Sequence, residues 1–159
     1  MNQFKWCMNV KNGIEIVEPN DNLCAAYFKK AENALNAAAS LKENKEWEVS
    51  SRYYAMYFAV YALLMKLGVK CENHICTIEF MKICLKDFFS SDDIALLQKA
   101  MTARVDVQYY TDRTVDEITY QKIKVNSGLF LVRCKEVSKK INKEIIKKIR
   151  ELLINYTEK

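Results

Sequence analysis

The sequence predicts an all-α fold, and two properties of its composition lead to that expectation. The 159 residues include only three glycines and one proline, whereas an all-β fold needs turns built from such residues about every 8–12 positions. Half of the residues are hydrophobic and 28% are charged, the balance of a folded globular chain rather than a disordered one. The length suits a single domain.

The N-terminal 20 residues show no helical periodicity and are expected to form a short extended arm around Ile14, Ile16 and Val17. A first helix is predicted from Asn22 to about Lys42, because apolar residues recur there every three or four positions on one face. These residues are Leu23, Tyr27, Ala31, Ala34, Leu35 and Ala38. Asn20 or Asp21 is suited to cap its first turn.

A second helix is predicted from about Glu46 to Leu67. It is apolar on nearly all sides, which indicates a central, buried helix. Gly68 follows it at the position where a left-handed residue commonly ends a helix. The small residues Ser51, Ala55 and Ala59 recur every four positions and form a ridge that another helix can approach closely.

Two further helices are predicted from about His74 to Phe89 and from Ser90 or Ser91, acting as cap, to near Tyr110. After Thr114, which forms a potential capping box with Glu117, the whole remaining chain has a helical pattern. One helix of that length would span roughly 65 Å, against a radius of gyration of roughly 15 Å for this chain length. We therefore expect a break, either at residues 126–128 or at Asn142.

The C-terminal segment repeats Ile141, Ile145, Ile149, Leu152 and Tyr156 opposite a lysine-rich face. From residue 120 onward there are 11 lysines and arginines but only four glutamates, a balance of +7, so the rest of the chain is slightly acidic although the net charge is +5. The segment is either a further helix folded against the domain or an arm that packs on another chain. Its basic face suits RNA or an acidic partner, or is simply solvated.

Six cysteines are scattered along the chain, and we expect them to be reduced, buried thiols. Cys71, His74 and Cys76 lie close together, but they form only one of the two hooks that structural zinc sites normally need. We therefore expect no metal and no cofactor. No apolar run reaches the roughly 20 residues of a membrane span, so we expect a cytoplasmic protein without a membrane partner.

Four segments, in the right order, resemble the HEPN family and in particular its small standalone archaeal and bacterial members. They are Val17–Asn20 with the helix that follows, Ser51–Ala59 with its Arg-Tyr-Tyr-Ala-Met core, His74 at a helix start, and Arg104–Tyr110. The resemblance extends from about Glu15 to Ile141. It implies an antiparallel bundle of five to six helices, here followed by a basic C-terminal helical extension.

The same resemblance implies a homodimer, often paired with a minimal nucleotidyltransferase in a toxin–antitoxin-type system. Active HEPN members are metal-independent ribonucleases that use an arginine followed, four to six residues later, by a histidine. Arginine suits the phosphate and its developing charge, and histidine suits proton transfer. Here Tyr109 stands five positions after Arg104, where the motif has its histidine. Enzymatic activity is therefore uncertain on sequence grounds, and we expect a binding module.

The candidate residues for RNA or nucleotide binding combine positive charge with aromatic rings for base stacking. They are Arg104, Gln108, Tyr109, Tyr110, Arg113 and Arg52; if the protein is a ribonuclease, the catalytic set is Arg104, Tyr109 and His74. The competing structural reading pairs Arg104 with a carboxylate and packs Tyr109 into the core. The expected organisation is an arm (1–20), a HEPN-like domain (21–141) and a C-terminal helical extension (142–159).

Overall fold

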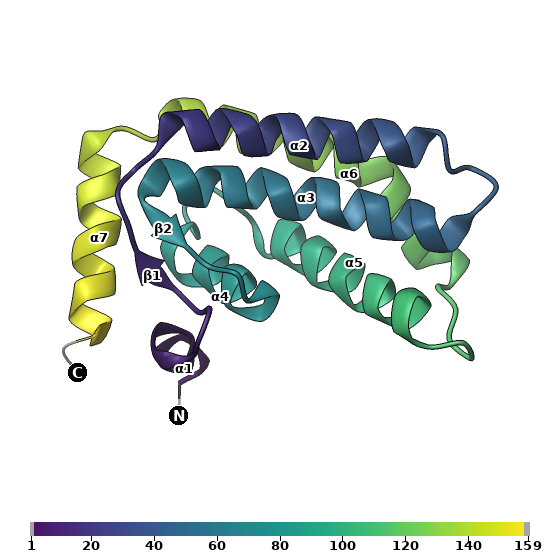
Figure 1. The fold of residues 1–159 in the computed structure, drawn as a ribbon, viewed down its shortest axis with the longest axis horizontal. Helices are drawn as coiled ribbons and strands as arrows, with labels where there is room; N and C mark the ends of the chain where they lie inside the picture. The colour runs from purple at the N-terminus through teal and green to yellow at the C-terminus, as the bar shows by residue number, and fades with distance from the viewer. Residues whose placement is uncertain (1, 158–159) are drawn as a thin grey trace.

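The computed structural model describes residues 2–157, and this part of the chain is predominantly helical, as the composition predicted (Figure 1). The helices are α1 (Gln3–Asn9), α2 (Asp21–Ala39), α3 (Lys45–Leu67), α4 (His74–Cys84), α5 (Ser91–Tyr109), α6 (Glu117–Lys140) and α7 (Lys143–Thr157). Two short strands, β1 (Glu15–Ile16) and β2 (Val69–Lys70), pair antiparallel.

The centre of the fold is α3, which packs against α2, α5 and α6 and is buried along most of its length. The small ridge of α3 is also buried: Ala55 and Ala59 are fully inaccessible, and the Ser51 hydroxyl donates a hydrogen bond to the Ala34 carbonyl of α2 at 2.7 Å. The ridge is therefore used within one chain and does not offer a surface to a second copy.

The caps explain where the main helices begin and end. The Asn20 side chain accepts a hydrogen bond from the Leu23 backbone N–H at the start of α2. Gly68 ends α3 with a φ of +74°, a conformation that favours glycine. The capping box predicted for Thr114 and Glu117 is wrong, because Asp116 caps α6 by accepting from the Thr119 N–H.

The N-terminal arm differs from the prediction in one respect. Residues Gln3–Asn9 form α1, a helix too short to show a clear period, before the chain becomes extended at β1. A disulfide joins Cys7 of α1 to Cys76 of α4, so the expectation of a free thiol is wrong for these two cysteines. The other four cysteines are free.

The C-terminal segment folds back on the domain. The break falls between α6 and α7 at Ile141 and Asn142, one of the two expected positions, and α7 lies across one end of the bundle (Figure 1). Ile149 and Leu153 are buried, and the Tyr156 ring contacts the Phe4 ring of α1 with centroids 4.7 Å apart.

The lengths of the helices bear on two expectations from the sequence. The third predicted helix is shorter than expected, since α4 ends at Cys84 rather than near Phe89. Among residues 2–157, none of the helices has both the length and the apolar character that crossing a membrane requires.

Candidate functional site

Three helices bring the only histidine of the chain next to a group of tyrosines. His74 is the first residue of α4, and its ring stacks on Tyr57 of α3 with centroids 4.1 Å apart and an interplanar angle of 7°. The Tyr53 hydroxyl lies 2.5 Å from Nδ1 of His74. His74 and α3 are adjacent because β2 and its loop turn the chain back after Gly68.

Arg104, in the last turns of α5, completes this cluster. Its side chain is 7% exposed, and its guanidinium carbon lies 5.2, 5.3 and 5.8 Å from the ring centroids of Tyr53, Tyr54 and Tyr109. Nη1 donates to Oε1 of Gln108 at 3.2 Å, while the buried Nε has no hydrogen-bond partner.

The surroundings of this guanidinium are unusual for a buried charge. Buried arginines normally pair with carboxylates, because leaving such a charge uncompensated is costly. Within residues 2–157, no carboxylate forms an ion pair with Arg104; aromatic rings and one amide surround it instead. Cation–π contacts offset part of the cost, and an anion would offset the rest.

The titratable groups beside Arg104 are held neutral. Burial, reinforced by the positive charge of Arg104, lowers the pKa of His74 to about 4. Burial raises the pKa of Tyr53 well above its ordinary value, although the charge of Arg104 opposes that rise. Burial likewise raises the pKa of Tyr57. At neutral pH, Arg104 therefore supplies the positive charge of the cluster.

The hydrogen-bond roles follow from these protonation states. A guanidinium has only donors, and that of Arg104 lies against the hydroxyl side of Tyr53. The Tyr53 oxygen therefore accepts from that direction, and its proton is left for Nδ1 of His74. The neutral imidazole then carries its own proton on Nε2, which is a further hydrogen-bond donor of the cluster.

We predict that His74 titrates with a pKa near 4 in the folded protein, against an ordinary value of 6.5. Because the unfolded chain binds this proton more readily, stability should fall as the pH drops from 6.5 to 4. The measurement is an NMR pH titration of the imidazole, which is unambiguous because the chain has one histidine. A His74 pKa at or above 6.5 would mean that the imidazole is neither buried nor close to the positive charge of Arg104.

Two neighbouring hollows form a groove beside residues that contact Arg104, although Arg104 itself lines neither. One has a volume of about 390 Å³ and is lined by Trp47, Tyr54, Phe58 and Gln108, among others. The other, of about 330 Å³, shares Trp47 and Gln108 and adds Tyr109. Trp47 is 58% exposed and Tyr109 67% exposed. Such rings are suited to stack on nucleic-acid bases.

Trp47 was not among the candidates from the sequence, although it lies within the predicted central helix that is apolar on nearly all sides. The only local signal was its place in the first turn of α3, next to the exposed Glu46; Glu48 on its other side is buried. Tyr109 lies at the surface near Arg104 rather than in the core, and the carboxylate pairing considered for Arg104 does not occur.

Two other candidates, Tyr110 and Arg113, follow the end of α5. The Arg113 guanidinium carbon is 3.6 Å from the Tyr110 ring centroid, and Nη1 of Arg113 forms an ion pair with Asp106 at 2.8 Å. This pair extends the basic, aromatic surface beyond Tyr109, but the charge of Arg113 is already balanced by Asp106.

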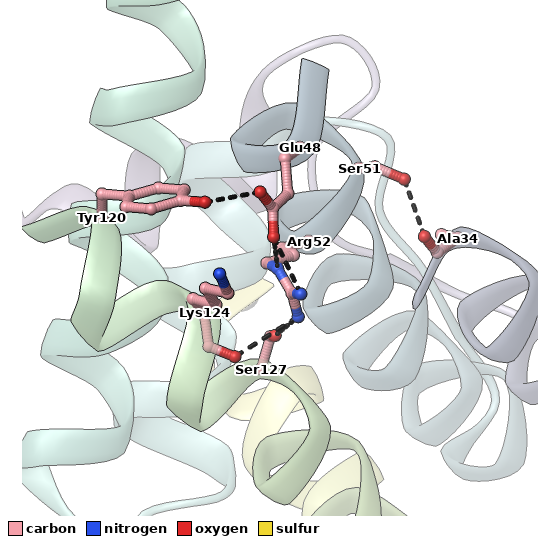
Figure 2. A network of polar contacts seen from close by, with 7 residues as sticks. All are labelled: Ala34, Glu48, Ser51, Arg52, Tyr120, Lys124 and Ser127. Atoms are coloured by element: carbon pink, nitrogen blue, oxygen red, sulfur yellow. Dashed lines mark hydrogen bonds and ion pairs between the residues drawn. The ribbon is translucent and has the colours of Figure 1, made fainter. Parts of the chain in front are cut away.

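Arg52 does not join the cluster around Arg104. Figure 2 shows it between α3 and α6, where it binds Glu48 at 2.9 Å, the Ser127 hydroxyl at 3.1 Å and the Lys124 carbonyl at 3.3 Å. Its guanidinium is thus occupied by partners within the chain, and its role in this structure is to join two helices.

The carboxylate of this network is fully buried. Glu48 accepts a hydrogen bond from the Tyr120 hydroxyl at 2.6 Å as well as those from Arg52 (Figure 2). Burial raises the pKa of Glu48, but the bonds from Tyr120 and Arg52 outweigh it and hold that pKa below its usual range.

The zinc hook considered for Cys71, His74 and Cys76 is not available as three free ligands, because Cys76 is bonded to Cys7. In the part of the chain that the structure describes, no group of three potential ligands from His, Cys, Asp and Glu is suited to hold a metal ion. Comparison with known protein-family models gives no match for this chain, and neither does comparison with the curated proteins.

Proposed function

We propose that this chain is a HEPN-type binding module that holds a phosphate group of RNA or of a nucleotide at Arg104. The observation that carries the proposal is the buried guanidinium of Arg104, which has no carboxylate partner and one unsatisfied N–H. Phosphate is the anion that arginine binds best, through charge-assisted hydrogen bonds.

The proposed binding mode uses the groups around that guanidinium. Phosphate oxygens accept hydrogen bonds from Arg104 and from Nε2 of His74. A base attached to the phosphate lies in the adjoining groove, where Trp47 and Tyr109 provide exposed rings for stacking. Gln108, which now accepts from Arg104, has both a donor and an acceptor for a base edge.

The wider setting rests on the resemblance to HEPN proteins. It comprises a homodimer in the cytoplasm and a minimal nucleotidyltransferase as partner in a toxin–antitoxin-type system. The helical fold is compatible with this setting, and the basic face of α7 adds positive charge to the molecule.

The second candidate function is a metal-independent ribonuclease, and one observation favours it. His74 and Arg104, 30 residues apart in the sequence, both contact Tyr53 and thus lie in one cluster. This supplies a histidine that the motif around Arg104 lacks. A pKa of about 4 makes His74 a weak base at neutral pH, however, so we favour binding without cleavage.

A ribonuclease assay in EDTA tests the choice, comparing wild type with Arg104→Ala and His74→Ala. We expect wild type to bind single-stranded RNA without cleaving it. If wild type cleaves RNA and both substitutions abolish the cleavage, the protein is a ribonuclease and not a binding module alone. Absence of both binding and cleavage, for RNA and for nucleotides, would refute the proposal.

A further inference from the structure

One face of α6 carries a row of apolar side chains that nothing in the described chain covers. Ile118, Val125, Leu129 and Val132 are between 53% and 72% exposed. The opposite face of the same helix is buried in the domain through residues such as Ile123 and Phe130. Contiguous exposed apolar residues of this kind mark interaction surfaces.

The spacing of this row is that of a helix–helix seam. With Lys122 and Glu136 included, the row runs through positions 118, 122, 125, 129, 132 and 136, so the steps alternate between four and three residues. Alternation of four and three keeps every member on one side of a helix and is the pattern that packs against another helix in a coiled coil. The partner that fits this face is therefore a helix.

The two charged residues in the row indicate which helix fits this face and in which direction it runs. Lys122 lies toward the N-terminal end and Glu136 toward the C-terminal end, with Leu129 midway between them. If a second α6 packs antiparallel around Leu129, Lys122 of each copy meets the end of the other that carries Glu136. A parallel pair would instead bring like charges together, which is unfavourable.

We infer that the Ile118–Val132 face of α6 binds the same face of a second copy of this chain, with the two helices antiparallel. The arrangement is self-complementary, as a two-fold interface requires. It deepens the homodimer of the proposed function by naming its surface. That surface differs from the small ridge of α3, which is buried within one chain, and from the apolar side of α7, which packs on the domain.

Sedimentation velocity on the full chain across the micromolar range tests the surface. We expect wild type to have the mass of two chains and Leu129→Glu to raise the dimer dissociation constant at least about tenfold. Leu23→Glu is the matched control, since Leu23 is an exposed leucine on another helix, α2. A wild type that stays monomeric, or a dimer that Leu129→Glu leaves intact, would overturn the inference.

Charge reversal tests the direction. Lys122→Glu and Glu136→Lys should each weaken the dimer, and the double variant should restore it, because only the antiparallel pair exchanges these charges between copies. A double variant no stronger than the single ones would refute the antiparallel arrangement. The mass is measured without RNA, and RNA affinity is tested at Arg104, so failure of either proposal is recognised separately.

Discussion

Replacing Arg52 with alanine is expected to lower the free energy of unfolding by about 3–5 kcal/mol, because it leaves a fully buried carboxylate without its counter-charge. Glu48 is inaccessible to solvent, and its two oxygens are bound by Arg52 and Tyr120. After the substitution the Tyr120 hydroxyl is the one remaining side-chain hydrogen-bond donor to Glu48 within the described part of the chain. The bonds from Arg52 to Ser127 and to the Lys124 carbonyl, which link α3 to α6, are lost as well.

Urea denaturation of wild type and Arg52→Ala at neutral pH measures this loss. The control is Lys147→Ala, which removes a cation from an exposed ion pair with Glu151 on α7. Exposed pairs of this kind contribute at most about 1 kcal/mol. Equal effects of the two substitutions would mean that the Glu48 network does not stabilise the fold.

The same network predicts a dependence on pH. Because folding lowers the pKa of Glu48, its stabilising effect is complete above the ordinary pKa of glutamate and is lost as the pH falls through the lowered value. Wild type should therefore lose stability in acid more steeply than Glu48→Gln. This loss begins at lower pH than the one expected from His74, so the two contributions can be separated.

Replacing Arg104 with glutamine is expected to weaken ligand binding without lowering stability, in contrast to Arg52→Ala. Affinity for single-stranded RNA or for a nucleotide should fall about ten- to a hundredfold, the equivalent of one charged hydrogen-bonding group worth roughly 1.5–3 kcal/mol. Stability should be unchanged or higher, because the substitution removes a buried charge that has no carboxylate partner.

Fluorescence anisotropy with a short labelled RNA in EDTA, together with urea denaturation, measures both quantities. Arg133→Gln is the matched control, since Arg133 is an exposed arginine of α6 that pairs with Asp93. A large loss of stability in Arg104→Gln, with RNA affinity no lower than that of the control, would assign Arg104 a structural role instead.

Much of the helical framework could be predicted because it depends on local patterns. The long apolar stretch of α3, the cap at Asn20 and the left-handed Gly68 are all encoded within a few neighbouring residues. The helix α1 was missed because seven residues hold fewer than two full turns of pattern. The cap at Asp116 was missed because Thr114, two residues earlier, has equally suitable chemistry.

The candidate site was harder to predict because it is assembled by tertiary contacts. Arg104 and Tyr109 were found through the motif, but nothing local indicates that His74 reaches Tyr53 or that Arg104 lacks a carboxylate. Arg52 appeared in the same motif-based list, yet two of its partners come from α6, more than 70 residues away, and only Glu48 lies within α3. The disulfide between Cys7 and Cys76 also depends on distant segments meeting.

Binding of a phosphate-bearing ligand by the cluster of Arg104 and His74 can be measured directly, because the chain has a single histidine. The measurement is the NMR signal of the His74 ring while a short single-stranded RNA, and separately a nucleoside monophosphate, is added to wild type and to Arg104→Gln. We predict a saturable shift in wild type that is lost or greatly weakened in Arg104→Gln. A His74 signal that does not move with either ligand, or that moves equally in both proteins, would mean that this cluster does not bind the phosphate.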